Sequence, residues 1–168
     1  MVTRERHVRR PREAPAAAAV GPVVLGTLSS GIDPAAERIA IESALDAGVP
    51  LIVVNVVQLP PCPRALAMGG PEALAFPHEE QYEAVRGTAE RAAKFGLRVE
   101  HLRVSSPRPA RALVQIAQER AAGLLVLGPE RRRRIARRVR FRRAARAVRR
   151  SASCLVWIAG EAPAAAAG

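Results

Sequence analysis

Residues 124–158 read LLVLGPERRRRIARRVRFRRAARAVRRSASCLVWI, and this stretch decides the fold class. It begins with a short apolar run, continues through a helical period crowded with arginine, and ends with a second apolar run. A strand, a helix and a strand in this order form a βαβ unit, whose two strands are parallel. The loop that follows the first strand, Gly128 to Arg134, lies where an α/β sheet places its ligands.

The rest of the chain repeats this alternation of short apolar runs and helical periods. We expect one helix from Asp33, its N-cap, to Gly48, a second from about Glu79 to Gly96, and a third from near Pro109. A fourth helix is expected over about Arg142 to Arg150. The expected strands are Val23–Leu28, Leu51–Val57, Val99–Val104, Leu124–Leu127 and Cys154–Ile158. The alternation predicts an α/β fold with a five-stranded parallel sheet and helices on both faces.

Apolar stripes at helical spacing give the residues that we expect to face the sheet. From the first helix to the fourth these are Ala36, Ile39, Ala40, Ala44 and Leu45; Tyr82, Val85, Ala89 and Ala92; Ala110, Leu113, Val114, Ala117 and Ala121; Ala144, Ala147 and Val148.

The length of 168 residues suits one domain, which we place at residues 21–160. Residues 1–20 are rich in Arg, Ala and Pro and are expected to be disordered, and the Ala-rich residues 161–168 are expected to be flexible. Two cysteines give no disulfide framework and no zinc spacing, which favours a reducing cytoplasm. No apolar run approaches the roughly 20 residues that span a bilayer, so no membrane insertion is expected.

Arginine dominates the charge of the chain. The formal net charge is +12, and twelve arginines lie between Arg131 and Arg150 with no acidic residue among them. They form either a solvated helix face or a surface that binds anions, because the guanidinium fork can hold a phosphate with two hydrogen bonds. With one Trp, one Tyr and three Phe there is no base-stacking platform, so nucleic-acid binding would be independent of sequence. The candidate anion-binding residues are Arg131, Arg132, Arg133, Arg134, Arg142, Arg146 and Arg149.

The sequence contains no arrangement of residues that is typical of a catalytic site. His7, His78 and His101 lie in separate elements, and no Ser-His-Asp order, carboxylate pair or metal cluster can be identified. Cys154 is most simply a buried strand residue. We therefore expect no enzyme activity, no metal and no cofactor.

Two segments carry a family resemblance. Pro109-Ala110-Arg111-Ala112-Leu113, with the later Ala122-Gly123-Leu124-Leu125-Val126-Leu127-Gly128, is similar to the universal stress protein pattern Pro-Ala-x-x-Leu, helix, Gly-Ala-Asp-Leu-Ile-Val-Met-Gly. The ending Ala152 to Ile158 resembles the family's Ala-Pro-Cys-Pro-Val-Leu-Val. The resemblance covers roughly residues 22–160. It implies an adenine-nucleotide α-hydrolase-like, Rossmann-like fold with strand order 3-2-1-4-5, and a homodimer along the fifth strand, here Leu155, Val156, Trp157 and Ile158.

The ATP-binding motif of that family is degenerate here. Members that hold ATP carry Gly-x-x-Gly, nine residues, then Gly-Ser or Gly-Thr after strand four, whereas this chain keeps Gly128 and has Arg131, Phe141 and Arg142 at the later positions. If Cys154 is aligned with the family cysteine, the last pair becomes Arg142-Arg143. The acidic residue after strand one is replaced by Leu28, and Gly-Asp-Pro before helix three becomes Pro107-Arg108-Pro109. The remnant nucleotide pocket comprises Gly128, Arg131, Ser29, Ser30 and Arg142.

Three functions fit these features. The first is a regulatory or protective module of the universal stress protein type, without tight ATP binding, that acts through protein contacts as a homodimer. The second is a basic accessory protein that binds nucleic acid or another polyanion through Arg131 to Arg150. The third is a weak nucleotide binder in which arginine replaces the glycine amides.

Overall fold

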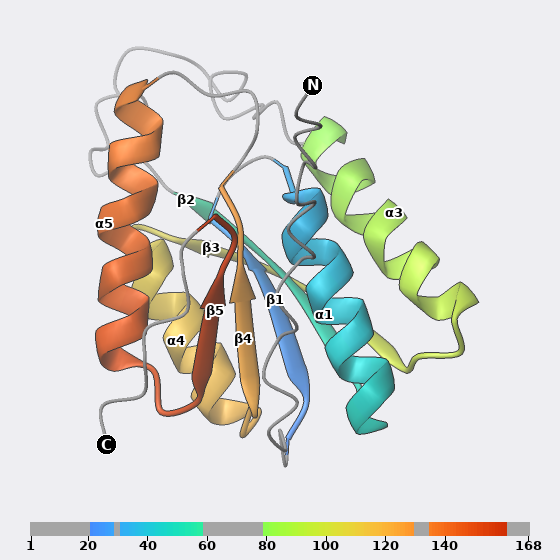
Figure 1. Ribbon diagram of the computed structural model, residues 1–168. Helices are drawn as coiled ribbons and strands as arrows, with labels where there is room; N and C mark the ends of the chain where they lie inside the picture. The colour runs from blue at the N-terminus through green and yellow to red at the C-terminus, as the bar shows by residue number, and fades with distance from the viewer. Residues whose placement is uncertain (1–20, 29–30, 59–78, 130–134, 161–168) are drawn as a thin grey trace, which may run out of the picture.

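The fold is seen in a computed structural model that describes residues 21–28, 31–58, 79–129 and 135–160. Its sheet has five parallel strands in the order β3-β2-β1-β4-β5, which confirms the predicted topology. β1 lies at the centre and β5 at an edge (Figure 1). The strands are β1 (Val23–Thr27), β2 (Leu51–Gln58), β3 (Val99–Ser106), β4 (Leu124–Leu127) and β5 (Leu155–Ile158).

Helices cover both faces of the sheet, as predicted. They are α1 (Pro34–Ala47), α3 (Glu79–Lys94), α4 (Pro109–Glu119) and α5 (Ile135–Ser151). α1 and α3 pack on one face, and α4 and α5 pack on the other (Figure 1). The chain therefore forms three layers, with the sheet in the middle.

The core is divided by the sheet into two apolar clusters. Alternate residues of each strand point to opposite faces, so Val24 and Leu125 face α4 and α5 while Val23 and Val126 face α1. Every residue from Leu51 to Val57 is buried, as a strand covered on both sides requires.

The arginine-rich helix is longer than the sequence indicated. α5 begins at Ile135, whereas the prediction began it near Arg142. Arginine and alanine have a high intrinsic helix propensity, and the seven residues before Arg142, IARRVRF, contain neither glycine nor proline, so they continue the helix. From Val139 onward, where burial is described, the fully buried residues of α5 are Ala145 and Val148, while Ala144 and Ala147, which were predicted to face inward, are half-buried.

Two other predicted inward residues point to solvent. Leu45 is 41% exposed, and Ile41 takes its place in the core. Ile41 is adjacent to Ala40 and one turn before Ala44 on the helix, so it lies closer to the centre of the buried stripe than Leu45 does. Ala121 is exposed because α4 ends at Glu119, and Ala121 occupies a left-handed turn with φ of 48°.

The start of α1 follows the predicted cap. Asp33 has extended backbone angles, and its Oδ1 accepts hydrogen bonds from the amides of Ala35 (2.9 Å) and Ala36 (3.1 Å). Pro34 at the first helical position lacks the amide that would need a partner. Gly48 ends the helix with φ of 64°, a conformation that glycine adopts without strain.

Replacement of the cap should weaken the fold. We expect Asp33→Ala to lower the free energy of unfolding by about 1 kcal/mol, because two buried or partly buried amides lose their acceptor. Asp33→Asn keeps an acceptor oxygen and should stay close to the wild type. Urea denaturation of the two variants tests this, and an equal decrease in stability for both would contradict the capping role.

The close contact between β1 and α4 depends on Gly26. A Cβ atom added there would lie 2.6 Å and 2.8 Å from the two terminal methyl carbons of the fully buried Leu113. Gly26→Ala should therefore destabilise the protein by roughly 1–3 kcal/mol, the usual cost of overpacking. Gly87→Ala is the matched control, since its Cβ would meet only the flexible end of Arg91 and alanine favours helix. A shift of the denaturation midpoint that is equal for both variants would refute the packing argument.

Candidate functional site

Gly128, one residue of the predicted remnant pocket, lies at the carboxyl end of β4 beside the start of α1. Gly128 follows β4 directly and is buried. A Cβ atom at this position would lie 2.3 Å from Cβ of Asp33 and 2.9 Å from Cβ of Ala36. The first turn of α1 thus packs directly on the backbone after β4. Gly128 is required here by the contact with the helix.

The N-terminus of α1 already has an anionic partner. Two of its first amides donate to the Asp33 carboxylate, which is buried against Gly128. Glu37 adds a second negative charge in the first turn. Carboxylates at a helix N-terminus satisfy its orphan amides and interact well with its dipole, so they compete with a phosphate for the same groups.

Of the other residues of the predicted remnant pocket, the structure describes Arg142. Phe141 is half-buried and packs into the cluster between the sheet and α4 and α5, and Arg142 next to it is exposed. Leu28, at the position of the acidic residue, also packs into that cluster. Strand β1 ends at Thr27, one residue earlier than predicted. Ser29, Ser30 and Arg131 lie outside the described residues, as do Arg132, Arg133 and Arg134.

Two buried polar side chains near the carboxyl end of β1 were not among the predicted site residues. Thr27 is 2% exposed, and its hydroxyl donates to the carbonyl oxygen of Gly31 at 3.0 Å. Asn55, also 2% exposed, lies opposite Thr27 in the parallel ladder. Its Oδ1 has no hydrogen-bond donor within the described ranges. The sequence contained a signal for Asn55 as a candidate site residue, because this polar residue interrupts an otherwise apolar strand.

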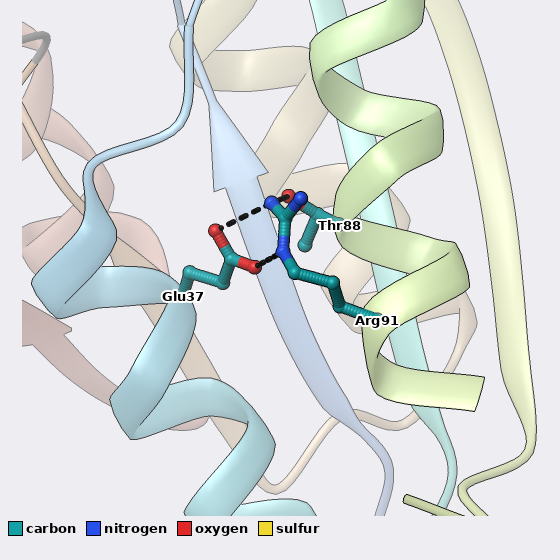
Figure 2. A network of polar contacts seen from close by, with 3 residues as sticks. All are labelled: Glu37, Thr88 and Arg91. Atoms are coloured by element: carbon teal, nitrogen blue, oxygen red, sulfur yellow. Dashed lines mark hydrogen bonds and ion pairs between the residues drawn. The ribbon is translucent and has the colours of Figure 1, made fainter. Parts of the chain in front are cut away.

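A polar contact holds α3 to α1 close to this end of the sheet. Arg91 donates to both carboxylate oxygens of Glu37, at 2.7 Å from Nε and 3.0 Å from Nη2, and Nη2 also contacts the Thr88 hydroxyl at 3.0 Å (Figure 2). The hydrogen bonds to Glu37 raise the pKa of the Arg91 guanidinium above its ordinary value. Thr88 is fully buried, so the network joins the core to the surface. The 54-residue separation of Glu37 and Arg91 explains why no sequence pattern indicated the contact.

The candidate anion-binding residues that are described lie on the outer side of α5. Arg142 and Arg146 are exposed, whereas Arg149 is partly buried. Arg140, Arg143 and Arg150 are exposed as well, although they were not named as candidates. The outer side of α5 therefore carries more accessible arginine than the prediction included, since the helix starts earlier.

The candidate dimer edge is a strand with one paired side. β5 pairs with β4 and has no other strand neighbour in the described sheet. Leu155 is 50% exposed, and Val156 and Trp157 are half-buried. Ile158 is only 3% exposed, because it packs into the cluster under α4 and α5. Leu155, Val156 and Trp157 can offer side chains to a partner, while Ile158 can offer mainly backbone.

The titratable groups outside these sites have ordinary packing roles. Burial lowers the pKa of His101 on β3, and the charge of Arg103 lowers it further. Cys154 precedes β5 and is half-buried, contrary to the expected buried strand position, because β5 begins at Leu155. Burial raises the pKa of the Cys154 thiol.

Across the described ranges, no three His, Cys, Asp or Glu residues are grouped as metal ligands would be. Nor does that part of the chain contain a helix long and apolar enough to cross a membrane.

Solved structures with the same fold are numerous. A universal stress protein solved in complex with cAMP is 25% identical, with a TM-score of 0.55, over 84% of this chain and 97% of that one. A universal stress protein from Archaeoglobus fulgidus is 26% identical, with a TM-score of 0.58, over 82% and 97%. UspA from Lactobacillus plantarum is 19% identical with a TM-score of 0.61, over 81% and 95%, and it shows the fold alone.

Comparison of the sequence with family profiles agrees with the structures. Among curated proteins, no significant match is found. The profile of the universal stress protein family matches residues 20–160, most of the chain and all of the sheet and its helices. The chain belongs to the universal stress protein family.

Proposed function

We propose that the protein is a regulatory or protective module that acts through protein contacts in the cytoplasm and does not bind ATP tightly. The observation that carries this proposal is the close packing of Asp33 and Ala36 on Gly128. In a phosphate-binding loop the backbone must be open to the ligand, and amides at the helix N-terminus must be available. Here Asp33 and Ala36 lie against Gly128, and the Asp33 carboxylate occupies amides of α1.

The family motif gives independent support. One related structure holds cAMP and another, from Archaeoglobus fulgidus, holds dAMP, so the fold is compatible with adenine nucleotides. In this chain Arg131, Phe141 and Arg142 replace the residues that the ATP-binding motif requires. Phe141 is anchored in the core and cannot leave its position without a loss of packing. The weak nucleotide binder stays as an alternative that the same measurement separates. We propose that the protein has no enzymatic activity.

ATP affinity should be weaker than ~1 mM, which corresponds to little more than about 4 kcal/mol of binding free energy. Isothermal titration calorimetry with ATP on the full chain checks this at physiological salt. Arg131→Ser serves as a comparison, because it removes a cation and keeps Asp33 and Ala36, the residues that pack on Gly128. Low-micromolar binding by the wild type would overturn the proposal, and its loss in Arg131→Ser would show that arginine had replaced the glycine amides.

Protein contacts begin, in this proposal, with a homodimer along β5. An uncovered strand edge presents unpaired amides and carbonyls, which is a template for pairing with another strand. The exposed half of Leu155 and the half-buried Val156 and Trp157 supply apolar surface beside that edge. Together these features favour β5 over β3 as the assembly edge, because β3 carries the exposed polar residues Arg103 and Ser105.

Sedimentation velocity over a range of concentrations should detect a dimer. Trp157→Glu and Val156→Lys should each shift the protein to the monomer, since a charge would be buried at the interface. Arg103→Glu on the opposite edge is the control and should leave the dimer unchanged. A wild-type monomer at high concentration, or a dimer that survives both β5 substitutions, would contradict assembly along β5.

Polyanion binding is the second candidate function. The observation that favours it is the exposure of Arg140, Arg142, Arg143, Arg146 and Arg150 along one side of α5. Salt-dependent binding of nucleic acid would support this candidate, because each phosphate contact releases counterions. It is compatible with the module function, since α5 and the β5 edge are different surfaces.

A further inference from the structure

The three-layer fold separates the charges of the helices. α5 carries eight arginines and no acidic residue, and it lies with α4 on one face of the sheet. α1 and α3, on the other face, together carry seven acidic and four basic residues. The layer that contains α5 is therefore strongly basic, and the layer of α1 and α3 is mildly acidic. Figure 1 shows the two pairs of helices on opposite faces of the sheet. The order of residues along the chain does not reveal this, because it does not say which helices share a face.

Four arginines outside α5 have carboxylate partners, which the exposed arginines of α5 lack. Ion pairs join Arg38 to Glu42, Arg86 to Glu90, Arg91 to Glu37 and Arg120 to Glu100, at 3.9, 2.8, 2.7 and 2.7 Å. Within the described part of the chain, no carboxylate lies within ion-pair distance of the five exposed arginines of α5: Arg140, Arg142, Arg143, Arg146 and Arg150.

The arginines of α5 repel one another. Arg142 and Arg146 are four residues apart, and Arg143 and Arg146 are three apart, so each pair is adjacent on the helix surface. Like charges at these spacings destabilise a helix by roughly 0.2–0.5 kcal/mol a pair. The helix persists because Ala145 and Val148 anchor its other side in the core. A bound polyanion would relieve the repulsion along the whole outer side.

α4 extends the basic surface. Arg111 is exposed on α4 on the side opposite the buried Leu113 and Ala117, and Arg108 is exposed just before the helix. The side-chain amide of Gln118 donates to the carbonyl of Ser151 at 3.4 Å, which places the carboxyl ends of α4 and α5 side by side. Both helices run in the same direction, so Arg108 and Arg111 lie toward the N-terminal half of α5. We define the α4–α5 face by Arg108, Arg111, Arg140, Arg142, Arg143, Arg146 and Arg150.

We propose that the α4–α5 face docks duplex nucleic acid through its phosphate backbone, with the acidic α1–α3 layer turned away from the duplex. The 17 residues of α5 span about 25 Å, and duplex DNA carries one phosphate charge per about 1.7 Å of its axis. Several arginines can therefore reach phosphates at once. Binding should be independent of base sequence, because guanidinium forks hold phosphates and no exposed aromatic residue lies on the described part of this face.

Two other partners fit less well. A second copy of the chain would have to use its acidic layer, but three of the seven acidic residues there, Glu37, Glu42 and Glu90, are already in ion pairs, and the four basic residues of the same layer would be repelled. An anionic bilayer binds helices that insert an apolar side. The apolar side of α5 is held in the core by Ala145 and Val148. On the described part of its exposed side Val139 is the one large apolar residue among the arginines, which is too little apolar surface to insert into a bilayer.

The test compares two variants with the same decrease in charge on opposite layers. The first replaces Arg142, Arg143 and Arg146 by Gln, and the second replaces Arg38, Arg86 and Lys94 by Gln. Fluorescence anisotropy with a short labelled duplex DNA of mixed sequence is measured on the full chain between about 50 and 200 mM salt. The first variant should raise Kd at least about tenfold and lower the log-log salt slope by about 0.9 for each phosphate that is no longer neutralised. The control variant should change Kd less than about twofold, since its residues lie on the layer turned away.

A third variant tests the contribution of α4. Arg108→Gln with Arg111→Gln should also weaken binding and reduce the slope. Hydrogen exchange of the wild type with and without the duplex should show protection in α4 and α5 and none in α1 and α3, which gives an answer even if a variant fails to fold.

This proposal rests on polyanion binding, the second candidate function. The experiment distinguishes a failure of polyanion binding from a failure of the proposed face. No duplex binding by the wild type near 150 mM salt, in the range where phosphate contacts normally act, would overturn both. Equal weakening by the first variant and the control would leave polyanion binding but overturn the oriented face. Unchanged binding in the α4 variant would overturn the two-helix surface and restrict the contact to α5. Tighter binding to vesicles of anionic lipid than to DNA would overturn the choice of nucleic acid.

Discussion

The burial of the central strands on both faces determines where the charges of this protein can lie. β1, β2 and β4 consist almost entirely of buried residues, and they must be apolar because helices cover them from both sides. Polar residues within them are rare, and Thr27 and Asn55 are buried, while Gln58 at the end of β2 is exposed. Within the described elements, arginine and the acidic residues therefore lie on the helices and on β3 at an edge. The separation of a basic and an acidic layer follows from this constraint together with the sequence of each helix.

The same constraint explains the packing around Gly128. Tight packing of α1 on the sheet brings Asp33 and Ala36 against Gly128, and the proposal that ATP is not bound tightly rests on this contact. The capped amides of α1 and the Glu37–Arg91 contact stabilise this arrangement. A fold that is compatible with nucleotides in related structures can thus serve here as a rigid support for two other surfaces, the β5 edge and the α4–α5 face.

These two surfaces differ in their physics. The β5 edge offers backbone hydrogen bonds and apolar side chains, whose contribution changes little with salt. The α4–α5 face offers charge, whose contribution falls steeply as salt increases. One can therefore be altered without the other, and salt concentration distinguishes an effect on assembly from an effect on anion binding.

Much of the architecture could be read from the chain before the structure was known. The predicted strand Leu124–Leu127 coincides with β4, and the predicted cap at Asp33 and end at Gly48 bound α1. Local rules suffice for such features, because strand patterns, caps and left-handed glycines depend on a few adjacent residues. The predictions that were wrong concern features that depend on tertiary packing. α5 starts earlier than its apolar pattern suggested, and Ile41 is buried in place of Leu45.

The order of the elements, the family and the changes in the glycine motif could all be identified from the sequence, since each depends on residues that are close together in the chain. Only the tertiary structure decided which distant residues meet. It brought Glu37 to Arg91, closed Asp33 over Gly128, and placed α4 beside α5 on one side of the sheet. The physical reason is that contacts across layers depend on how the strands are ordered in the sheet and on which face each helix crosses. Those choices bring together residues that lie far apart in the chain.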